Sequence, residues 1–363
     1  MKELSLRELN RTLLLRQHLT TRVSMPALDL IRHLIAVQGQ EPNWPYVGLW
    51  TRLTDFRHED LTTLLEDRTV VRATTIRRTV HLSTADDYRW LYPTVRPDPD
   101  AALRAIYFRE TLSGLDLGEF ATAGKELLTG RTVPRRDLGR ALTERFPHRD
   151  PGRLVHILGH LHPLIHDTDS ARWNNWGSYS VAVTLADEWT NAPLASAPQS
   201  ETMVLRYLAA FGPATIADIQ AWAGVTRLTE VVTRLRPRLR VFQDESGREL
   251  FDVPDAPLAA ADTPAPVRFL PAFDNALLAH RDRRRMISDE DRARINKIAS
   301  GGVPMYLVDG FVHGRWDLDG STIRVTPWHP LTRTDEAAIL EEAANLLPYI
   351  TPDTDGKVII DRR

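Results

Sequence analysis

Cysteine is absent from the 363 residues of this chain. This absence excludes a disulfide framework, and it also excludes any metal site that depends on thiolate ligands. A chain without cysteine fits a reducing compartment, and we therefore expect a cytoplasmic protein. Its length is sufficient for two to four domains, each with its own hydrophobic core.

The sequence also lacks a long hydrophobic run. Its first residues, Met1-Lys2-Glu3-Leu4, lead directly into a charged amphipathic pattern, which is not typical of a secretory signal. No apolar stretch approaches the length of about 20 residues that a membrane-spanning helix needs. We therefore expect neither secretion nor a membrane partner.

Lysine is scarce, because 42 of the 46 basic residues are arginine. Codon usage in a GC-rich genome favours arginine, and arginine is also the better side chain for binding phosphate. Composition alone does not separate these two causes. The net charge of −2 shows that the protein as a whole is not basic, so binding of nucleic acid would depend on local clusters of arginine.

The order of the predicted elements repeats three times along the chain. Each repeat has helical segments followed by two short segments rich in β-branched residues, which is the order of a winged-helix domain. We predict an α+β protein with three tandem winged-helix domains, at residues 1–115, 116–195 and 196–258. A stretch rich in Pro, Ala and Asp then leads into a small β-rich, barrel-like C-terminal domain at residues 265–363.

Individual elements follow from local patterns. In the first repeat, helices are predicted at 5–18, 25–37 and 59–65, and strands at 70–74 and 79–83. Wing strands are expected at 165–167 and 172–174 in the second repeat, and at 240–243 and 249–252 in the third. The C-terminal strands are expected at 267–270, 305–308, 311–316 and 322–325, with a helix at 335–347.

Two glutamines, Gln38 and Gln40, follow an amphipathic helical run. In an extended backbone their side chains point to the same side, and Gly39 between them allows another molecule to approach closely. Pro42 and Pro45 are expected to end any helix and to stiffen the turn. Taken alone, this segment is also typical of an ordinary polar junction between a helix and a loop.

Four histidines, His156, His160, His162 and His166, have a spacing that could suit zinc. However, Pro163 interrupts the run, and no glutamate stands in an H-E-x-x-H arrangement. The apolar neighbours favour another interpretation, in which His156 and His160 flank the core of the second repeat. A zinc hydrolase is therefore a minor alternative, and we expect no metal and no other cofactor.

Arginines cluster in three places: within 131–153, along 234–240 and at 281–285. A solvent-exposed helix face is one interpretation of such clusters, and contact with DNA phosphates is the other. The residues expected to contact DNA are Arg135, Arg136, Arg234, Arg236, Arg281 and Arg283. Contacts of this kind position a protein on DNA without reading its sequence.

Two further side chains are candidates for the same surface. Trp44, between Asn43 and Pro45, is either exposed near a substrate or part of the core. His81, in the strand predicted at 79–83, is a candidate for contact with DNA or for support of the site, and a histidine that faces the core is the alternative.

Four groups of short motifs stand out when the chain is considered as a whole. They are Gln38-Gly39-Gln40 with Gly48-Leu49-Trp50, Arg78-Thr79-Val80-His81-Leu82, Leu270-Pro271-Ala272-Phe273-Asp274-Asn275 with His280-Arg281-Asp282-Arg283, and Val308-Asp309-Gly310 with Gly314-Arg315-Trp316. Over nearly its whole length the chain thereby resembles the winged-helix alkylpurine DNA glycosylases of the AlkZ type, a bacterial family that unhooks azinomycin crosslinks.

In that family the Gln-x-Gln pair holds the catalytic water, so the resemblance implies this role for Gln38 and Gln40. The implied substrate is double-stranded DNA that carries bulky N7-alkylguanine adducts or interstrand crosslinks, and the implied purpose is self-protection in a bacterium that produces a DNA-alkylating metabolite. We expect a monomer that acts at the nucleoid. The middle residue is usually apolar, and Gly39 departs from this pattern. It would either make room for a bulkier lesion or loosen the turn.

The chemistry is compatible with amides rather than carboxylates at this site. A guanine alkylated at N7 is cationic and leaves readily, so the enzyme needs mainly a well-placed water. No lysine lies near the two glutamines in the sequence, which argues against Schiff-base chemistry and favours a monofunctional glycosylase. The alternative from another class is a non-catalytic winged-helix DNA-binding protein, such as a transcriptional regulator.

Overall fold

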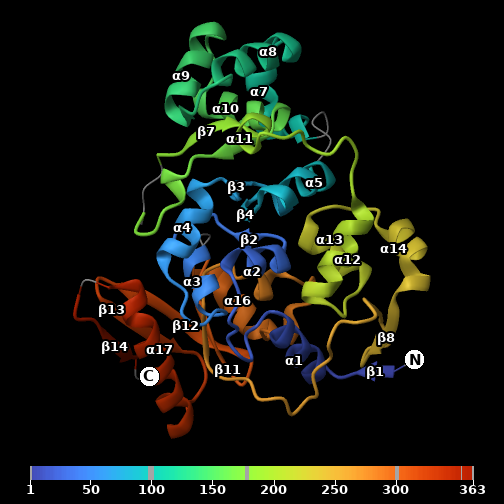
Figure 1. The fold of residues 1–363 in the computed structure, drawn as a ribbon, viewed down its shortest axis with the longest axis vertical. Coiled ribbons are helices and arrows are strands. Elements are labelled where there is room, and N and C mark those ends of the chain that lie inside the picture. Colours follow the sequence, from blue (N-terminus) through green and yellow to red (C-terminus); the bar gives the residue numbers. More distant parts are fainter. Residues whose placement is uncertain (1, 97–101, 176–179, 299–301, 353, 362–363) are drawn as a thin grey trace.

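The computed structural model describes residues 2–96, 102–175, 180–298, 302–352 and 354–361. Helices and mostly antiparallel strands are mixed throughout, and the strands form sheets of six, three and five members. Figure 1 shows the helices arranged around these sheets in separate lobes. The expected mixture of α and β structure is therefore confirmed.

The six-stranded sheet has the order β2-β4-β3-β6-β7-β5. Its strands are β2 (Val37–Gln38), β3 (Val70–Thr74), β4 (Val80–Thr84), β5 (Val133–Pro134), β6 (Leu164–His166) and β7 (Ala182–Leu185). The central pair, β3 and β6, is antiparallel, with Arg72 opposite His166 and Ala73 opposite Ile165. The first and second predicted repeats thus share one continuous sheet.

Helices of the first repeat pack around one end of this sheet. They are α2 (Ala27–Leu34), α3 (Trp44–Trp50), α4 (His58–Glu66) and α5 (Ala85–Val95). As expected, α2 ends before Pro42, which lies in a turn. Pro45 does not end a helix but lies in the first turn of α3, where a missing N–H costs nothing. The start of α5 is capped by Thr84, whose hydroxyl accepts a hydrogen bond from the main chain of Asp87.

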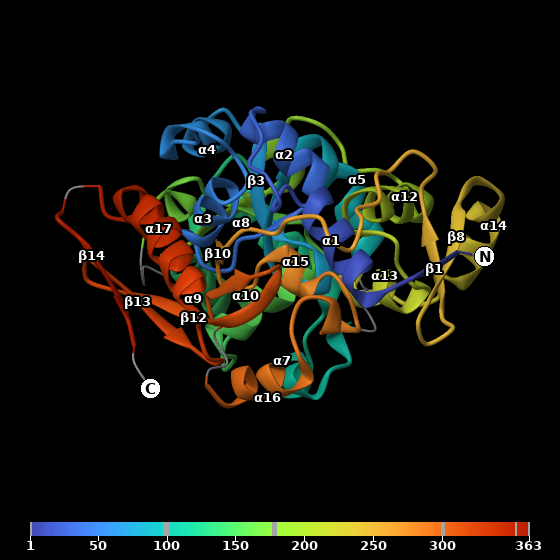
Figure 2. The same cartoon turned by 90° about the horizontal axis from the view of Figure 1, so that it is seen from below.

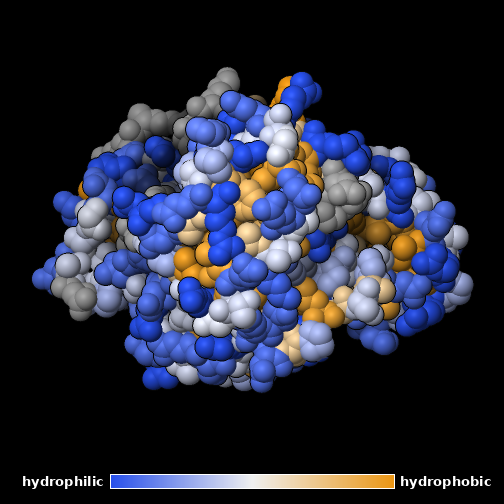
Figure 3. Space-filling view, turned by 90° about the horizontal axis from the view of Figure 1, so that it is seen from above, coloured by the Kyte–Doolittle hydropathy of each residue, from blue (hydrophilic) through white to orange (hydrophobic). Residues whose placement is uncertain are grey.

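The second repeat forms the uppermost lobe in Figure 1. Its helices are α8 (Leu117–Leu128), α9 (Arg135–Arg145), α10 (Pro151–Leu161) and α11 (Ala186–Thr190). The short helices η2 (Ile106–Phe108) and α7 (Arg109–Leu112) lie within the predicted bounds of the first repeat, although Phe108 packs into the core of the second. The strand predicted at 172–174 was wrong. Asp167 accepts a hydrogen bond from Ser170 and closes a turn there, and the second wing strand is β7 instead. Figure 3, which views the molecule from above, shows hydrophobic side chains gathered within a hydrophilic surface.

The third repeat has the helices α12 (Ser200–Phe211), α13 (Ile216–Ala223) and α14 (Thr229–Leu235), followed by the hairpin of β8 (Arg240–Asp244) and β9 (Glu249–Asp252). Thr215 and Asp218 form a capping box at the start of α13, and Gly224 ends it with a positive φ of 74°. The helix expected at 5–18 is present as α1 (Leu6–Arg16), but its core residues pack with those of α12. The strand before it, β1 (Lys2–Leu4), pairs in parallel with β8.

The C-terminal region contains the five-stranded sheet, in the order β10-β11-β12-β13-β14. Its elements are β10 (Arg268–Leu270), α15 (Asn275–Leu278), α16 (Asp289–Ile298), β11 (Met305–Val308), β12 (Phe311–Asp319), β13 (Thr322–Pro327), α17 (Arg333–Ile350) and β14 (Lys357–Ile360). The four expected strands and the expected helix are confirmed, whereas α15, α16 and β14 were missed. Because β10 and β14 remain the edges of the sheet, no closed barrel forms in the described ranges.

Figure 2 shows α17 beside β12, β13 and β14, whereas β1 and β8 lie at the opposite side of the molecule. The largest hydrophobic cluster joins α1 with residues of α12 to α14 and of the C-terminal region. None of the helices in the described parts of the chain is long and apolar enough to cross a bilayer.

Candidate active site

The segment with the two glutamines runs along the edge of the six-stranded sheet. Gln38 lies in β2 opposite His81 of β4, and the main-chain N–H of Gly39 donates to the carbonyl of Val80 at 2.9 Å. Gln38 is 6 % exposed, whereas Gln40 is exposed. The strand pairing therefore places one amide inside the protein and the other at its surface.

Both glutamine side chains reach the start of β4, at Val80 and at Thr79, the residue before the strand. The hydroxyl of Thr79 donates to Oε1 of Gln38 at 3.4 Å, and the main-chain N–H of Val80 donates to Oε1 of Gln40 at 3.3 Å. These are long hydrogen bonds, and each amide oxygen has a second lone pair. The two side chains thus converge on adjacent residues while each oxygen keeps the capacity to accept another hydrogen bond.

A buried arginine, Arg72 of β3, holds the main chain of this segment. Its Nε donates to the carbonyl of Gly39 at 2.9 Å, and Nη2 donates to the carbonyl of Gln40 at 3.1 Å. Its Nη1 lies 3.3 Å from Nδ1 of His166 and 3.3 Å from the hydroxyl of Ser170. Burial lowers the pKa of Arg72 to about 10, so the side chain stays protonated at neutral pH. Arg72 therefore fastens the glutamine segment to the second repeat.

The C-terminal region supports the other end of the segment. The side-chain oxygen of Asn275 accepts a hydrogen bond from the main-chain N–H of Gln38 at 3.3 Å, and its amide nitrogen donates to the carbonyl of Ala36. Next to it, Asp274 forms a buried ion pair with both terminal nitrogens of Arg52, at 2.8 and 2.9 Å. These contacts fix the backbone of Gln38 from outside its own repeat.

Two cavities adjoin the glutamines. Gln38 lines a cavity of about 10 Å³ together with Trp44, Phe273 and Asn275, and this volume is close to the smallest that holds one water molecule. Gln40 lines a larger cavity of about 430 Å³. Trp44 is half-buried, with its ring 5.7 Å from that of Trp316 in an edge-to-face arrangement, so it forms part of the wall beside Gln38.

His81 faces the interior. It is 1 % exposed, and its Nδ1 lies 2.9 Å from the carbonyl of Thr79. Burial, followed by the charge of Arg77, lowers the pKa of His81 to about 3, so the imidazole is neutral at pH 7. The core-facing alternative fits this geometry, because a side chain so deeply buried does not reach DNA.

The space left by Gly39 lies on the core side of the strand. A Cβ at this position would be 3.5 Å from the main-chain nitrogen of Leu82 and 3.6 Å from its Cγ, which are ordinary contacts. Since alternate residues of a strand face opposite sides, a side chain here would point away from Gln38 and Gln40. The idea that Gly39 makes room for a bulkier lesion therefore has no steric basis in this structure.

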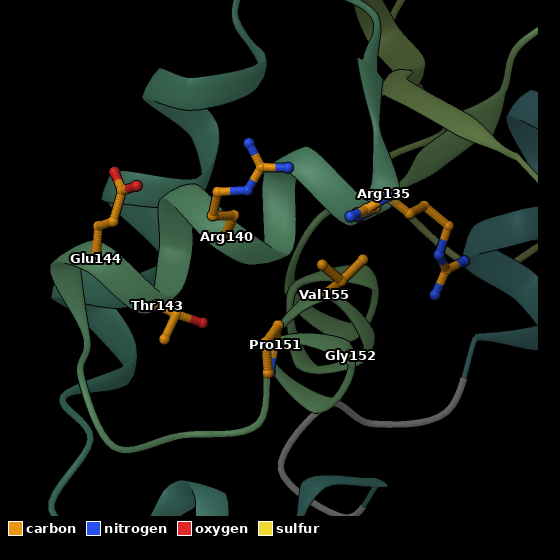
Figure 4. A pocket seen from close by; sticks show the side chains of 8 residues that line it. Arg135, Arg140, Thr143, Glu144, Pro151, Gly152 and Val155 are labelled. Carbon is orange, nitrogen blue, oxygen red and sulfur yellow. The ribbon is translucent and has the colours of Figure 1, made fainter.

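The arginines expected to bind DNA fall into separate environments. Arg135 and Arg136 line a pocket of about 640 Å³ between α9 and α10, which Figure 4 shows with Glu144 turned away from Val155. By contrast, Arg234 pairs with Glu201 at 3.2 Å, and Arg236 pairs with both oxygens of Glu249, at 2.6 and 2.7 Å.

The third cluster lies closer to the glutamine segment. Arg281 is exposed and Arg283 is half-buried. Burial, followed by the charge of Arg283, lowers the pKa of Arg77, which precedes β4, to about 10. The structure therefore brings Arg283 towards the strand that carries His81. Contact of any of these arginines with DNA remains a prediction.

The four histidines do not converge. His156 and His160 stack with ring centroids 5.3 Å apart, His162 contacts the carbonyl of Ala121, and His166 contacts Arg72. Among the residues that the structure describes, no group of three or more suitable side chains is arranged to hold a metal ion.

Sequence reasoning missed Arg72, Thr79 and Asn275 as supports of the site. Thr79 and Asn275 stand within motifs that carry the family resemblance, and that was the one signal for them. Arg72 gave no signal beyond an arginine within a β-branched segment.

Comparison with known proteins shows which family the chain resembles. The model of the family described as "DNA glycosylase AlkZ-like" matches residues 31–349. An interstrand DNA cross-link repair glycosylase from Streptomyces sahachiroi is 24 % identical over 356 residues, covering 91 % of this chain and 92 % of that protein.

A solved structure, that of the S. sahachiroi DNA glycosylase AlkZ, superimposes with a TM-score of 0.80 at 20 % identity, covering 99 % of this chain and all of the other. This likeness shows that the fold is shared. Since the family model covers most of the chain, including the glutamine segment, the protein belongs to the AlkZ-like DNA glycosylases.

Proposed function

We propose that this glycosylase releases bulky N7-alkylguanine adducts from double-stranded DNA, interstrand crosslinks among them, and that Gln38 and Gln40 hold the attacking water. The relative from S. sahachiroi is named for the repair of interstrand crosslinks. The observation that carries the proposal is the convergence of the two glutamine amides on Thr79 and Val80 at one edge of the sheet.

The reaction needs mainly a correctly placed water molecule. N7 alkylation gives guanine a positive charge, so the bond between C1′ and N9 breaks with its electron pair moving to the base, which leaves neutral. The oxygen of the water bonds to C1′ and its proton is lost to solvent. An amide oxygen that accepts a hydrogen bond from this water orients it without adding charge, and two such oxygens fix it from two directions.

Alanine variants of the two glutamines test this proposal. Gln38→Ala and Gln40→Ala should each lower release of an N7-alkylated base about 100-fold or more, because the water loses one of its two holders. Release is measured by mass spectrometry on alkylated and on crosslinked duplexes. Gln243→Ala is a matched control, since Gln243 lies in the β8–β9 hairpin and its side-chain amide donates to the carbonyl of Gly247.

Two results would count against the proposal. If either alanine variant released bases as fast as the Gln243 control, the glutamines would not hold the water. If the wild-type protein released no base from duplexes treated with several N7-alkylating agents, the substrate class itself would be wrong. Tight binding to one undamaged sequence without release would instead favour the alternative of a regulator.

We also propose that the three repeats are winged helices, within the boundaries predicted from the sequence. Strand order supports this view. In the first two repeats the strand before the second helix pairs with the last strand, as β2 with β4 and β5 with β7. In the third repeat, Ala214 makes the corresponding bridge to Phe251 of β9. A monomer on duplex DNA that carries alkylated guanine is the expected working form.

A further inference from the structure

The cavity of about 430 Å³ beside Gln40 is not used by the proposed chemistry. It lies between the segment that joins β3 to β4 and helix α10 of the second repeat, and η2 forms a further part of its wall. Its volume falls within the range of about 300 to 1,000 Å³ that is usual for sites of drug-sized ligands. It is therefore large enough for a group of several rings.

Aromatic side chains form one wall of this cavity. His156 and His160, one helical turn apart on α10, are stacked at an interplanar angle of 19°. The ring of Phe108 stands edge-on to both, with centroid distances of 5.1 and 5.6 Å. Tyr107 lies 5.9 Å from His156 and is 51 % exposed, with the guanidinium of Arg153 5.0 Å from the centre of its ring. The wall thus presents ring faces and edges, the surfaces that planar aromatic groups pack against.

The charges around the cavity are of one sign. Arg78, Arg96 and Arg135 line it, and no aspartate or glutamate does so among the described residues. The imidazoles add no further charge at neutral pH, because burial lowers the pKa of His156 and lowers that of His160 to about 4. A neutral aromatic wall flanked by arginines fits an uncharged ring system attached to a phosphate backbone.

We propose that this cavity binds the planar aromatic arm of an N7-alkylguanine adduct while the sugar of the same nucleotide lies at the two glutamines. Gln40 lines the cavity and is also one of the two glutamines, so an arm attached at N7 needs to extend only a short way from the reacting bond. The proposal rests on the proposed glycosylase substrate. It makes the second repeat the part of the protein that selects the lesion.

Gly159 offers a way to fill the cavity without disturbing its walls. It lies on α10, and a Cβ there would meet one atom within 4 Å, Cδ1 of Leu164 at 4.0 Å. Gly159→Leu would therefore occupy the cavity, while Gly159→Ala changes the helix in the same way and adds a single carbon. Tyr107→Ala removes an exposed ring and should leave the fold intact.

The substrates are duplexes that carry N7 adducts of an acridine-linked nitrogen mustard or of the ring-free mustard with the same linker. We expect Gly159→Leu to lower kcat/KM for the acridine adduct about tenfold or more, since loss of stacking on one ring commonly costs this much. Tyr107→Ala should lower it severalfold. Both variants should release the ring-free adduct and bind undamaged duplex nearly as well as the wild-type protein. Gly159→Ala should behave like the wild-type protein on both adducts.

The outcomes separate the two proposals. Equal losses on both adducts with Gly159→Leu would mean that the cavity serves the nucleotide itself, and no loss on the acridine adduct would mean that it binds nothing in the reaction. Either result overturns the inference while leaving the glycosylase activity in place. Absence of release from both adducts by the wild-type protein would instead overturn the proposed function.

Discussion

Replacing Arg72 by methionine should separate the activity of this glycosylase from its stability. The guanidinium donates to the carbonyls of Gly39 and Gln40, at 2.9 and 3.1 Å, from a buried position. Methionine keeps much of the volume of the side chain but has no donor. The variant therefore releases the main chain of the glutamine segment, which we propose holds the water, without opening a large cavity.

The two effects differ in size. Each lost hydrogen bond to a charged group is worth about 1.5 to 3 kcal/mol, but burial of a guanidinium costs several kcal/mol, and that cost is also removed. The free energy of unfolding should therefore fall by only about 1 to 3 kcal/mol. A shift of about 1 Å in the glutamine segment should lower the rate of base release about 100-fold. Arg72→Lys should give an intermediate rate, because one ammonium group cannot reach both carbonyls with the same geometry.

Base release is measured in single turnover with excess enzyme, and stability is measured by urea unfolding. Arg16→Met is the matched control, since Arg16 forms a buried ion pair with Asp252 at 2.7 Å, within the packing of α1 on the third repeat. Its loss should cost about 3 to 5 kcal/mol and leave the rate per folded molecule unchanged. The reasoning is refuted if Arg72→Met releases bases within about threefold of the wild-type rate.

Three further predictions concern neighbouring residues. The pKa of His81 is about 3 in the folded protein and about 6.5 in the unfolded chain, so the unfolded chain takes up a proton first and the free energy of unfolding decreases as the pH drops below 6.5. His81→Asn, which keeps a donor to Thr79, should therefore lose about 2 kcal/mol less than the wild-type protein between pH 6.5 and pH 5 in urea titrations. An unchanged dependence of stability on pH would contradict this. The methyl group of Gly39→Ala should fit beside Leu82, and the variant should release the same range of lesions as the wild-type protein. A narrower range in a competition assay would support the idea that Gly39 makes room for a bulkier lesion. Asn275→Leu should lower the free energy of unfolding by about 2 to 5 kcal/mol, because the buried N–H of Gln38 and the buried carbonyl of Ala36 lose their partners. A decrease of less than about 1 kcal/mol in the same titrations would show that water replaces the lost hydrogen bonds.

Local patterns predicted much of the fold, and they failed where partners are distant. In the third repeat, the strands expected at 240–243 and 249–252 are present as the hairpin of β8 and β9. The pairing of β3 with β6 joins residues 94 positions apart at Arg72 and His166, and no local pattern encodes such a register. For the same reason the sequence did not reveal that α1 packs with the third repeat.

The candidate site shows the same limit. Gln38 and Gln40 were recognisable because they are neighbours in the sequence and carry a family motif. Asn275 supports Gln38 across 237 residues, and the sequence alone gave no reason to pair them. The side of the strand that Gly39 faces also depends on the strand pairing, so the sequence alone could not indicate that a side chain at this position would lie against Leu82.

The continuous sheet has a consequence for how damaged DNA is accommodated. Because β3 and β6 are hydrogen-bonded to each other, the first two lobes cannot hinge about the segment that joins them without breaking main-chain pairs. The distance from the glutamines to α10 is therefore set by the protein before any lesion arrives. If the cavity at α10 binds the arm of the adduct as proposed, a duplex whose adduct does not match this spacing has to kink or unwind, and the deformability of the surrounding base steps becomes part of the selection.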